Sequence, residues 1–199
     1  MSNFDLKMTK ETFARLFVVA LDNKMNLSSF IEDLGKSAFI QRIESKEYDE
    51  SLNRDLLDVF ASFTKRTIAK DNSYGVYNDA YWCGSSYFEL HLRLNRPFSY
   101  IFLKLPLEEL LGIYSIYHEM DISHLMDYFQ KKEKETTILR ALCKKKKCSI
   151  TKLSIQTGIN AATLHKYNAD DGALYKGSFQ NIYKIAQFFQ TPINLFYKE

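Results

Sequence analysis

The sequence predicts two domains of different fold class, an α+β domain over residues 1–132 and an all-α domain over residues 136–199. Three observations support this division. The hydrophobic period changes from helical spacing to alternation near Tyr87. Past Lys147, a glycine separates two short amphipathic segments, which is typical of paired helices. The charge also differs between the two parts, because residues 136–199 carry a net charge of +7 and residues 1–135 a net charge of −4.

Composition excludes several classes of protein. With 46% hydrophobic and 15% aromatic residues, a chain of 199 residues buries a core and is not disordered. No run approaches ~18 consecutive apolar residues, so we expect no membrane span. The first residues lack a secretory signal, and the three cysteines (Cys83, Cys143, Cys148) are odd in number and scattered. Both features are typical of a cytoplasmic protein with reduced thiols.

Helical periodicity dominates the first part of the chain. Apolar residues at 3.6-residue spacing predict helices over residues 9–24, 28–44 and 48–63, with Thr9 as a cap for the first. The pair Ser28 and Glu32 suggests a cap for the second helix, which Gly35 weakens. A turn follows over residues 70–75.

The pattern then favours a small antiparallel sheet. Residues 74–78 are short and aromatic, and residues 87–94 alternate apolar and polar side chains. A turn at residues 95–97 joins that segment to a second predicted strand over residues 98–105. Pro106 fits the start of a helix over residues 107–111, and Asp121 can cap a helix over residues 122–130. The charged stretch 131–135 is either an exposed link or a helical extension.

The C-terminal segment has the outline of a helix-turn-helix. Ser149 can cap a helix that begins near Ile150, and Gly158 follows where a helix end needs positive φ. Asn160 is the next cap, and Thr163, Leu164 and Tyr167 give the second helix its inward face. Upstream, an apolar stripe at Ile138, Leu139 and Leu142 suits a first helix. Downstream, Ser178 can cap a helix that ends before Thr191-Pro192.

These residues resemble a known family. The order Ser149-x-x-x-Leu153-Ser154-x-x-Thr157-Gly158-Ile159-Asn160-x-x-Thr163-Leu164-x-Lys166-Tyr167, followed by a helix from Ser178 and by Pro192-Ile193-Asn194-Leu195-Phe196, is similar to the Xre/Cro repressor type of helix-turn-helix domain. The similarity covers about residues 136–196. It implies a five-helix bundle, usually dimeric, that binds double-stranded DNA through the second helix of the motif and most often controls transcription.

The chain departs from the family pattern at two places. Ile150 stands where a Gln often braces the DNA backbone, and Ala161 and Ala162 stand where long polar side chains usually begin the recognition helix. Alanine can contact only a thymine methyl, so direct readout falls to few groups and shape can contribute. The predicted DNA-contacting residues are Ser149, Asn160, Ala161, Thr163, His165 and Lys166, together with Lys145, Lys146 and Lys147.

The run Lys144–Lys147 has two interpretations. Beside a helix-turn-helix it is suited to phosphate contact with a salt-dependent affinity. A run of four lysines is also typical of a solvated linker between helices.

We expect no catalytic residue, cofactor or metal site. His118 and His124 are six residues apart, so they fall on different faces of a helix, whereas a helical metal pair needs i, i+4 spacing. Cys83 in the segment 81–86 could be a nucleophile, but a single thiol without a placed base is common by chance. The aromatic residues 74–87 could stack a ligand, although packing is the more usual use of such a cluster.

The sequence therefore predicts a cytoplasmic, bacterial, DNA-binding transcriptional regulator that acts as a homodimer. The acidic N-terminal domain would serve sensing, dimerisation or binding of a protein or small ligand. The alternative is an antitoxin-like or phage-related protein-interaction module in which DNA binding is secondary.

Overall fold

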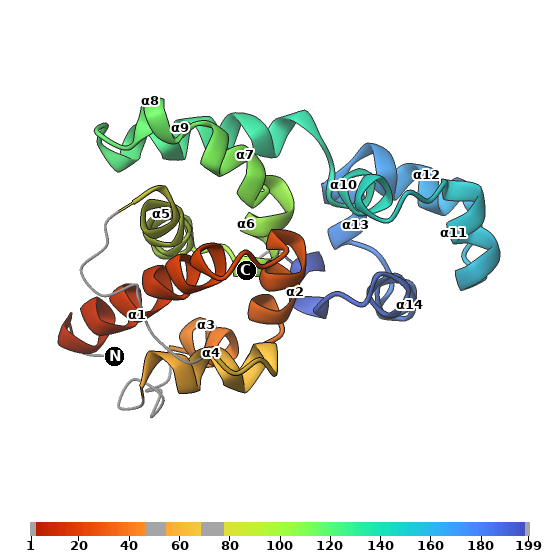
Figure 1. The fold of residues 1–199 in the computed structure, drawn as a ribbon. Helices are drawn as coiled ribbons and strands as arrows, with labels where there is room; N and C mark the ends of the chain where they lie inside the picture. The colour runs from red at the N-terminus through yellow and green to blue at the C-terminus, as the bar shows by residue number, and fades with distance from the viewer. Residues whose placement is uncertain (1–2, 47–54, 69–77, 198–199) are drawn as a thin grey trace. The chain divides into compact units, whose positions relative to one another are not determined.

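The computed structural model describes residues 3–46, 55–68 and 78–197. It is 77% helical, and no β-strand occurs among these residues. The chain divides into two compact units, residues 1–126 and 127–199. Each unit is a helical assembly with its own buried residues (Figure 1).

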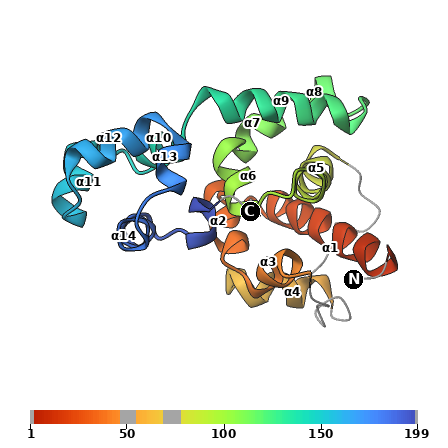
Figure 2. The ribbon, with the colours of Figure 1, turned by 180° about the vertical axis from the view of Figure 1, so that it is seen from behind.

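The N-terminal unit contains eight described helices and the start of a ninth. Their bounds are α1 Asn3–Asp22, α2 Leu27–Gly35, α3 Ala38–Glu44, α4 Leu56–Thr64, α5 Asp79–Leu94, α6 Phe98–Lys104, α7 Leu107–Gly112, α8 Tyr114–Tyr117 and α9 Ile122–Glu135. Helices α1 and α5 make the most extensive pairing and lie side by side in both views (Figure 1 and Figure 2). The division between the two units falls within the residue range of α9.

The predicted α+β fold is wrong, because the N-terminal unit is helical. The two expected strands belong to α5 and α6. Helix α5 begins at the cap residue Asn78, whose side chain accepts a hydrogen bond from the backbone N–H of Tyr81. Its buried positions 80, 83, 84, 86, 87, 88 and 90 form one broad face of a helix, whereas Leu92, which alternation would bury, is 39% exposed. The expected strand over residues 74–78 lies almost wholly outside the described residues.

Three predicted helices also need adjustment. Thr9 lies inside α1, where its hydroxyl donates to the Asp5 carbonyl at 2.6 Å and does not cap the helix. The expected helix over residues 28–44 is two helices, because Ser37 begins α3 as its cap with an Oγ···N distance of 3.1 Å to Ile40. The part of the third predicted helix before residue 55 lies outside the described residues.

Aromatic side chains fill the core of the N-terminal unit. Phe13 of α1 packs against Phe88 of α5 and Phe98 of α6, with ring centroids 5.6 and 4.8 Å apart. Phe17 meets Phe30 of α2 edge to face at 5.1 Å. Burial of such large rings is a major stabilising contribution, and tilted and edge-on pairs suit their quadrupoles. The aromatic residues expected in a sheet therefore hold helices together.

The C-terminal unit continues with α10 Ile138–Lys145, α11 Ile150–Thr157, α12 Ala161–Ala169, α13 Asp171–Tyr175, α14 Phe179–Phe189 and the 3₁₀ turn η2 Ile193–Phe196. Thr137, Ser149, Asn160, Asp170 and Ser178 cap the five α-helices in turn. Each side-chain oxygen accepts an N–H that the helix start leaves without a partner. The buried side chains Leu139, Leu153, Leu164, Ile182 and Phe196 form its core.

Candidate nucleic-acid interface

Helices α11 and α12 pack directly against each other and are joined by a turn of three residues (Figure 1). Gly158 ends α11 with φ of +68°, and its N–H donates to the Ser154 carbonyl at 2.8 Å. Side chains other than glycine rarely adopt this left-handed conformation. Asn160 then starts α12, with its Oδ1 2.8 Å from the N of Ala162. The predicted capping roles of Ser149, Gly158 and Asn160 are confirmed.

Side-chain hydrogen bonds stabilise the end of α11 and the turn that follows it. The Ser154 hydroxyl donates to the carbonyl of Ile159 at 2.6 Å, and the Thr157 hydroxyl donates to the carbonyl of Leu153 at 2.7 Å. The side chain of Ile159 is only 4% exposed, so it anchors the turn in the core of the unit. The turn that leads into α12 is therefore tied to the end of α11 and anchored in the core.

Helix α12 has a buried and an exposed face. Leu164 and Tyr167 point into the unit, with 0% and 7% exposure. The exposed residues are Ala161, Ala162, His165, Lys166 and Ala169. Their spacing of i, i+1, i+4, i+5 and i+8 places them on one stripe of the helix. Thr163 is half-buried, at the edge of this stripe.

The two caps have part of their hydrogen-bonding capacity in use. Ser149 Oγ accepts from the N–H of Lys152 at 3.1 Å, so its hydroxyl proton can still be donated. Asn160 uses its side-chain oxygen in the cap, and its NH₂ group can donate to an acceptor on DNA. Both residues are exposed, as are His165 and Lys166. The predicted contact residues of α11 and α12 are therefore accessible to solvent, with Thr163 only partly so.

The four lysines at the end of α10 differ in their surroundings. Lys146 Nζ lies 4.3 Å from the ring centroid of Phe188 in α14 and donates to the Phe188 carbonyl. This ammonium is engaged by a cation–π contact within the unit. Lys144 and Lys147 are exposed, and Lys145 is exposed with a contact of its own. The lysine run is thus divided between an internal contact and solvent-facing charge.

Two polar contacts that the sequence did not reveal connect the start of α10 to the end of α12 and the start of α13. The Thr137 hydroxyl donates to the carbonyl of Asn168 at 2.9 Å. Asp171 accepts from the backbone N–H of Ile138 at 2.7 Å. The residues in each pair are more than 30 positions apart, so no local sequence pattern predicts these contacts. Together they hold the junction of α12 and α13 against the start of α10.

The other candidate groups lie in the N-terminal unit. His118 Nδ1 is 2.9 Å from the Tyr114 carbonyl of its own helix. No cluster of three or more His, Cys, Asp or Glu that could hold a metal occurs among the described residues. Cys83 is fully buried in α5, and burial, followed by the charge of Asp79, raises its pKa far above the usual range. Such a thiol is a poor nucleophile.

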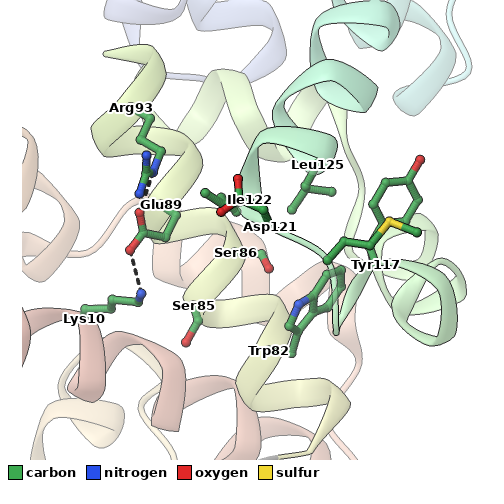
Figure 3. Close-up of a pocket in the computed structure, with 11 residues that line it drawn as sticks. Lys10, Trp82, Ser85, Ser86, Glu89, Arg93, Tyr117, Asp121, Ile122 and Leu125 are labelled. Atoms are coloured by element: carbon green, nitrogen blue, oxygen red, sulfur yellow. Dashed lines mark hydrogen bonds and ion pairs between the residues drawn. The ribbon is translucent and has the colours of Figure 1, made fainter.

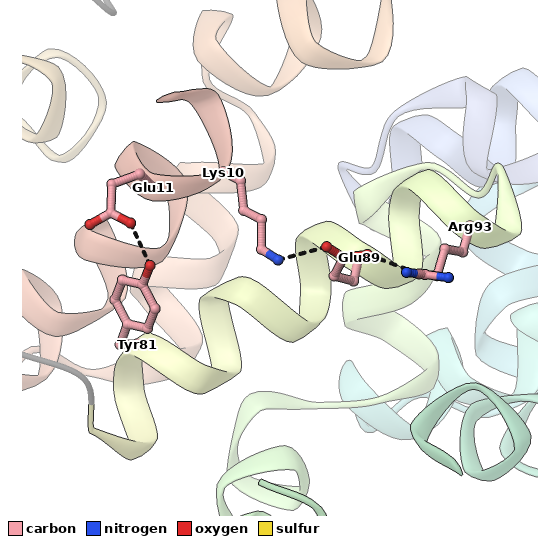
Figure 4. Close-up of polar contacts among 5 residues, drawn as sticks. All are labelled: Lys10, Glu11, Tyr81, Glu89 and Arg93. Carbon is pink, nitrogen blue, oxygen red and sulfur yellow. Dashed lines mark hydrogen bonds and ion pairs between the residues drawn. The ribbon is translucent and has the colours of Figure 1, made fainter. Parts of the chain in front are cut away.

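A cavity of about 330 Å³ opens in the same unit between α5 and the start of α9 (Figure 3). Trp82 and Tyr117 supply aromatic surface, and Glu89, Arg93 and Asp121 supply charge. Glu89 also bridges α1 and α5, because its carboxylate accepts from Lys10 at 2.6 Å and from Arg93 at 2.9 Å (Figure 4). Burial would raise the pKa of Glu89, but these two bonds outweigh it and lower the pKa below its ordinary value.

Comparison with known proteins identifies the C-terminal unit. Residues 139–194 match the family described as Cro/C1-type HTH DNA-binding domain. Neither the curated proteins nor the solved structures gave a match. None of the described helices is long and apolar enough to cross a membrane. The matched residues contain the capped helix pair, the glycine turn and the exposed stripe of α12, so residues 139–194 of this chain are a Cro/C1-type helix-turn-helix DNA-binding domain.

Proposed function

We propose that this protein is a sequence-specific transcriptional regulator of the Xre/Cro type, acting on double-stranded DNA. The observation that carries the proposal is the exposed stripe of α12 at the centre of a Cro/C1-type domain. Helix α12 would enter the major groove, as the second helix of such motifs does. Asn160, His165 and Lys166 would meet base edges, with Thr163 at the margin and Ala161 against a thymine methyl.

The phosphate backbone would be held by groups around the start of α11. The first N–H groups of a helix attract anions, and Ser149 can add its hydroxyl proton. Lys145 and Lys147 would add charge from the preceding turn, while Lys146 would contribute less because its ammonium lies over Phe188. Such contacts position the protein and carry no sequence information themselves.

The remaining assignments complete the proposal. Residues 136–199 form the DNA-binding domain and residues 1–132 a regulatory domain of a cytoplasmic, bacterial homodimer. The cavity beside Trp82 supports a small-ligand role for the regulatory domain, because it combines an aromatic wall with charged groups. Trp82 is the single tryptophan of the chain, so its fluorescence reports directly on occupancy of that cavity.

DNA binding is tested by gel shift and fluorescence anisotropy on the protein's own promoter. The full chain should bind with salt-sensitive affinity, and the double variant T163A/K166A should weaken the specific complex by about tenfold or more. Lys36→Ala removes one exposed charge from the N-terminal unit and is the matched control. Absence of salt-sensitive binding by the unmodified protein would overturn the proposal.

A second function is favoured by apolar exposure on α14. Phe179 and Tyr183 are 66% and 46% exposed, and their rings stack 6.0 Å apart. An exposed aromatic pair of this kind suits a protein partner, as in an antitoxin-like or phage-related interaction module. The double variant F179A/Y183A should then lose a co-purifying product of a neighbouring gene and keep its affinity for DNA. If F179A/Y183A still co-purified with that product and kept its function, the alternative would be rejected.

A further inference from the structure

Two cysteines occupy the paired positions of the motif that ends α10. The N–H of Cys148 donates to the carbonyl of Cys143 at 3.0 Å, and the N–H of Lys147 donates to the carbonyl of Lys144 at 3.2 Å. Lys147 has φ of +49°. These two bonds around a left-handed residue define a Schellman motif, in which the side chains of the first and last residues meet. Here both of those residues carry a thiol.

The two sulfurs are in contact. Cys143 Sγ and Cys148 Sγ are 3.8 Å apart, and both cysteines are free thiols. A disulfide requires about 2.05 Å between sulfurs, so bond formation needs an approach of less than about 2 Å by two short side chains. The backbone hydrogen bond between the same two residues keeps them together before any reaction. The contact therefore follows from the helix end itself.

The two thiols differ in access, and the third cysteine belongs to the other unit. Cys148 is partly exposed, whereas Cys143 is 9% exposed. Burial, and then the neighbouring Cys148 thiol, raise the pKa of Cys143 above its ordinary value. Cys148 is thus the thiol that an oxidant in solution reaches first. Cys83 lies fully buried in α5 of the other unit and serves as an internal reference.

We propose that Cys143 and Cys148 are a reversible oxidation site that closes to an intramolecular disulfide in the presence of hydrogen peroxide. The bond encloses Lys144–Lys147, which are the end of α10 and the start of the turn to α11, and it sits next to the Ser149 cap. The proposal does not depend on DNA binding, because its test measures the state of the thiols and uses no DNA.

The reaction has two steps. The Cys148 thiolate attacks peroxide, takes one oxygen and becomes a sulfenic acid, and the second oxygen leaves as water after proton transfer. The Cys143 sulfur then attacks the Cys148 sulfur, the S–O bond breaks, and a second water leaves with the Cys143 proton. In sum, two thiols and one hydrogen peroxide give one disulfide and two waters. The two sulfurs lose the two electrons that peroxide gains, and a dithiol reductant reverses the bond.

The experiment treats the reduced full-length protein with hydrogen peroxide, blocks the remaining thiols and digests with trypsin without reduction. Cleavage after lysine and arginine should leave residues 141–144 joined to residues 148–152, a cross-linked mass found only if the two cysteines are bonded. Two of the three thiols should be lost, Cys83 should remain a thiol, and dithiothreitol should restore both reactive thiols. On a non-reducing denaturing gel the oxidised protein should migrate as a monomer, and the rate of oxidation should not depend on protein concentration.

The variants Cys148→Ser and Cys143→Ser separate the roles. Cys148→Ser should leave Cys143 reduced at the same peroxide dose, whereas Cys143→Ser should leave Cys148 as a sulfenic acid that a sulfenic-acid probe captures. Three results would overturn the proposal. The first is the formation of disulfide-linked dimers, and the second is oxidation of Cys148 to sulfinic acid in the unmodified protein while Cys143 stays reduced. The third is loss of the Cys83 thiol at the same rate as the other two.

Discussion

A single backbone torsion sets the energetics of the turn before α11. Lys147 adopts φ of +49° at the end of α10, a conformation that costs a residue with a Cβ about 1–2 kcal/mol. Glycine avoids this cost and loses about 0.5–1 kcal/mol to its greater freedom when unfolded. Lys147→Gly should therefore raise the stability of the C-terminal unit by roughly 0.5–1 kcal/mol, measured by hydrogen exchange of the α10 and α11 amides.

Lys144 provides a control, because its substitution by glycine should lower the stability that Lys147→Gly raises. It lies three residues earlier, inside α10 and exposed. Lys144→Gly removes the same charge from the same run, but glycine within a helix costs about 0.5–1 kcal/mol. Equal effects of the two substitutions would show that charge, and not the left-handed torsion, governs stability here.

At the scale of elements, the pairing of α1 and α5 depends on a close approach at Gly84. A Cβ at this position would lie 2.6 Å from the Ala14 Cα and 2.9 Å from a ring carbon of Phe17. Because the Ala14 backbone cannot move without shifting α1, Gly84→Ala should lower the free energy of unfolding by about 1–3 kcal/mol. Thermal unfolding followed by circular dichroism measures the loss.

Gly112 provides the matched substitution. A Cβ there meets no atom within 4 Å and its φ is not positive. Gly112→Ala should leave the N-terminal unit as stable or raise its stability by up to about 1 kcal/mol. A destabilisation by Gly112→Ala equal to that of Gly84→Ala would contradict the steric explanation.

The ion pairs of Glu89 add a pH-dependent contribution to the same helix pair. Its pKa is lowered in the folded state, so the stabilisation is present above the ordinary value of 4.5 and is lost as pH falls through the folded pKa. Glu89→Gln should cost up to about 1 kcal/mol at pH 7, because the carboxylate is partly exposed. Denaturant unfolding from pH 7 to pH 3 should show this difference shrinking toward zero.

Glu119→Gln supplies the comparison for that series. The Glu119 side chain is 87% exposed, and its substitution should change stability by less than about 0.5 kcal/mol at any pH. If the two variants lost stability equally at pH 7, the bridge from Lys10 to Arg93 would have no special role.

Local signals predicted the C-terminal elements better than the N-terminal ones. Ser149, Gly158, Asn160 and Ser178 act through bonds to backbone groups two to four residues away, so a short sequence pattern contains the whole interaction. In α5, the buried Phe88 and Leu90 fit alternation, but Tyr87 between Glu89 and Ser85 is buried too, as the helix allows and a half-buried strand does not. Residues 79–86 mix aromatic residues with Gly84 and two serines, which concealed the first half of that helix, and its partner α1 lies some 70 residues away.

The candidate site shows the same division. The exposed stripe of α12 could be anticipated, since the buried Leu164 and Tyr167 fix the orientation of the helix. The contact of Lys146 with Phe188 joins residues 42 positions apart, so the sequence could not predict it. All four lysines of the run are exposed, so only tertiary packing distinguishes Lys146, whose ammonium contacts Phe188, from its neighbours.

At the scale of the whole molecule, the distribution of charge matters more than its sum. The chain has a net charge of +3, yet residues 136–199 carry +7 and residues 1–135 carry −4. Charges within about 10 Å of a phosphate dominate its attraction at 0.1 M salt. Affinity for DNA should thus follow the lysines near α11 and α12 and be insensitive to lysines of the N-terminal unit.

Salt dependence of DNA binding measures this directly. Each phosphate contact contributes about −0.9 to the slope of log K against log salt, so about four contacts predict a loss of roughly 100-fold between 50 and 200 mM salt. Lys147→Gln should reduce the magnitude of the slope by about 0.9. Lys146→Gln should change it less, because that ammonium already lies over Phe188. Lys36→Gln, in the acidic part of the chain, should leave it unchanged, and equal slopes for all three variants would mean that net charge alone drives association.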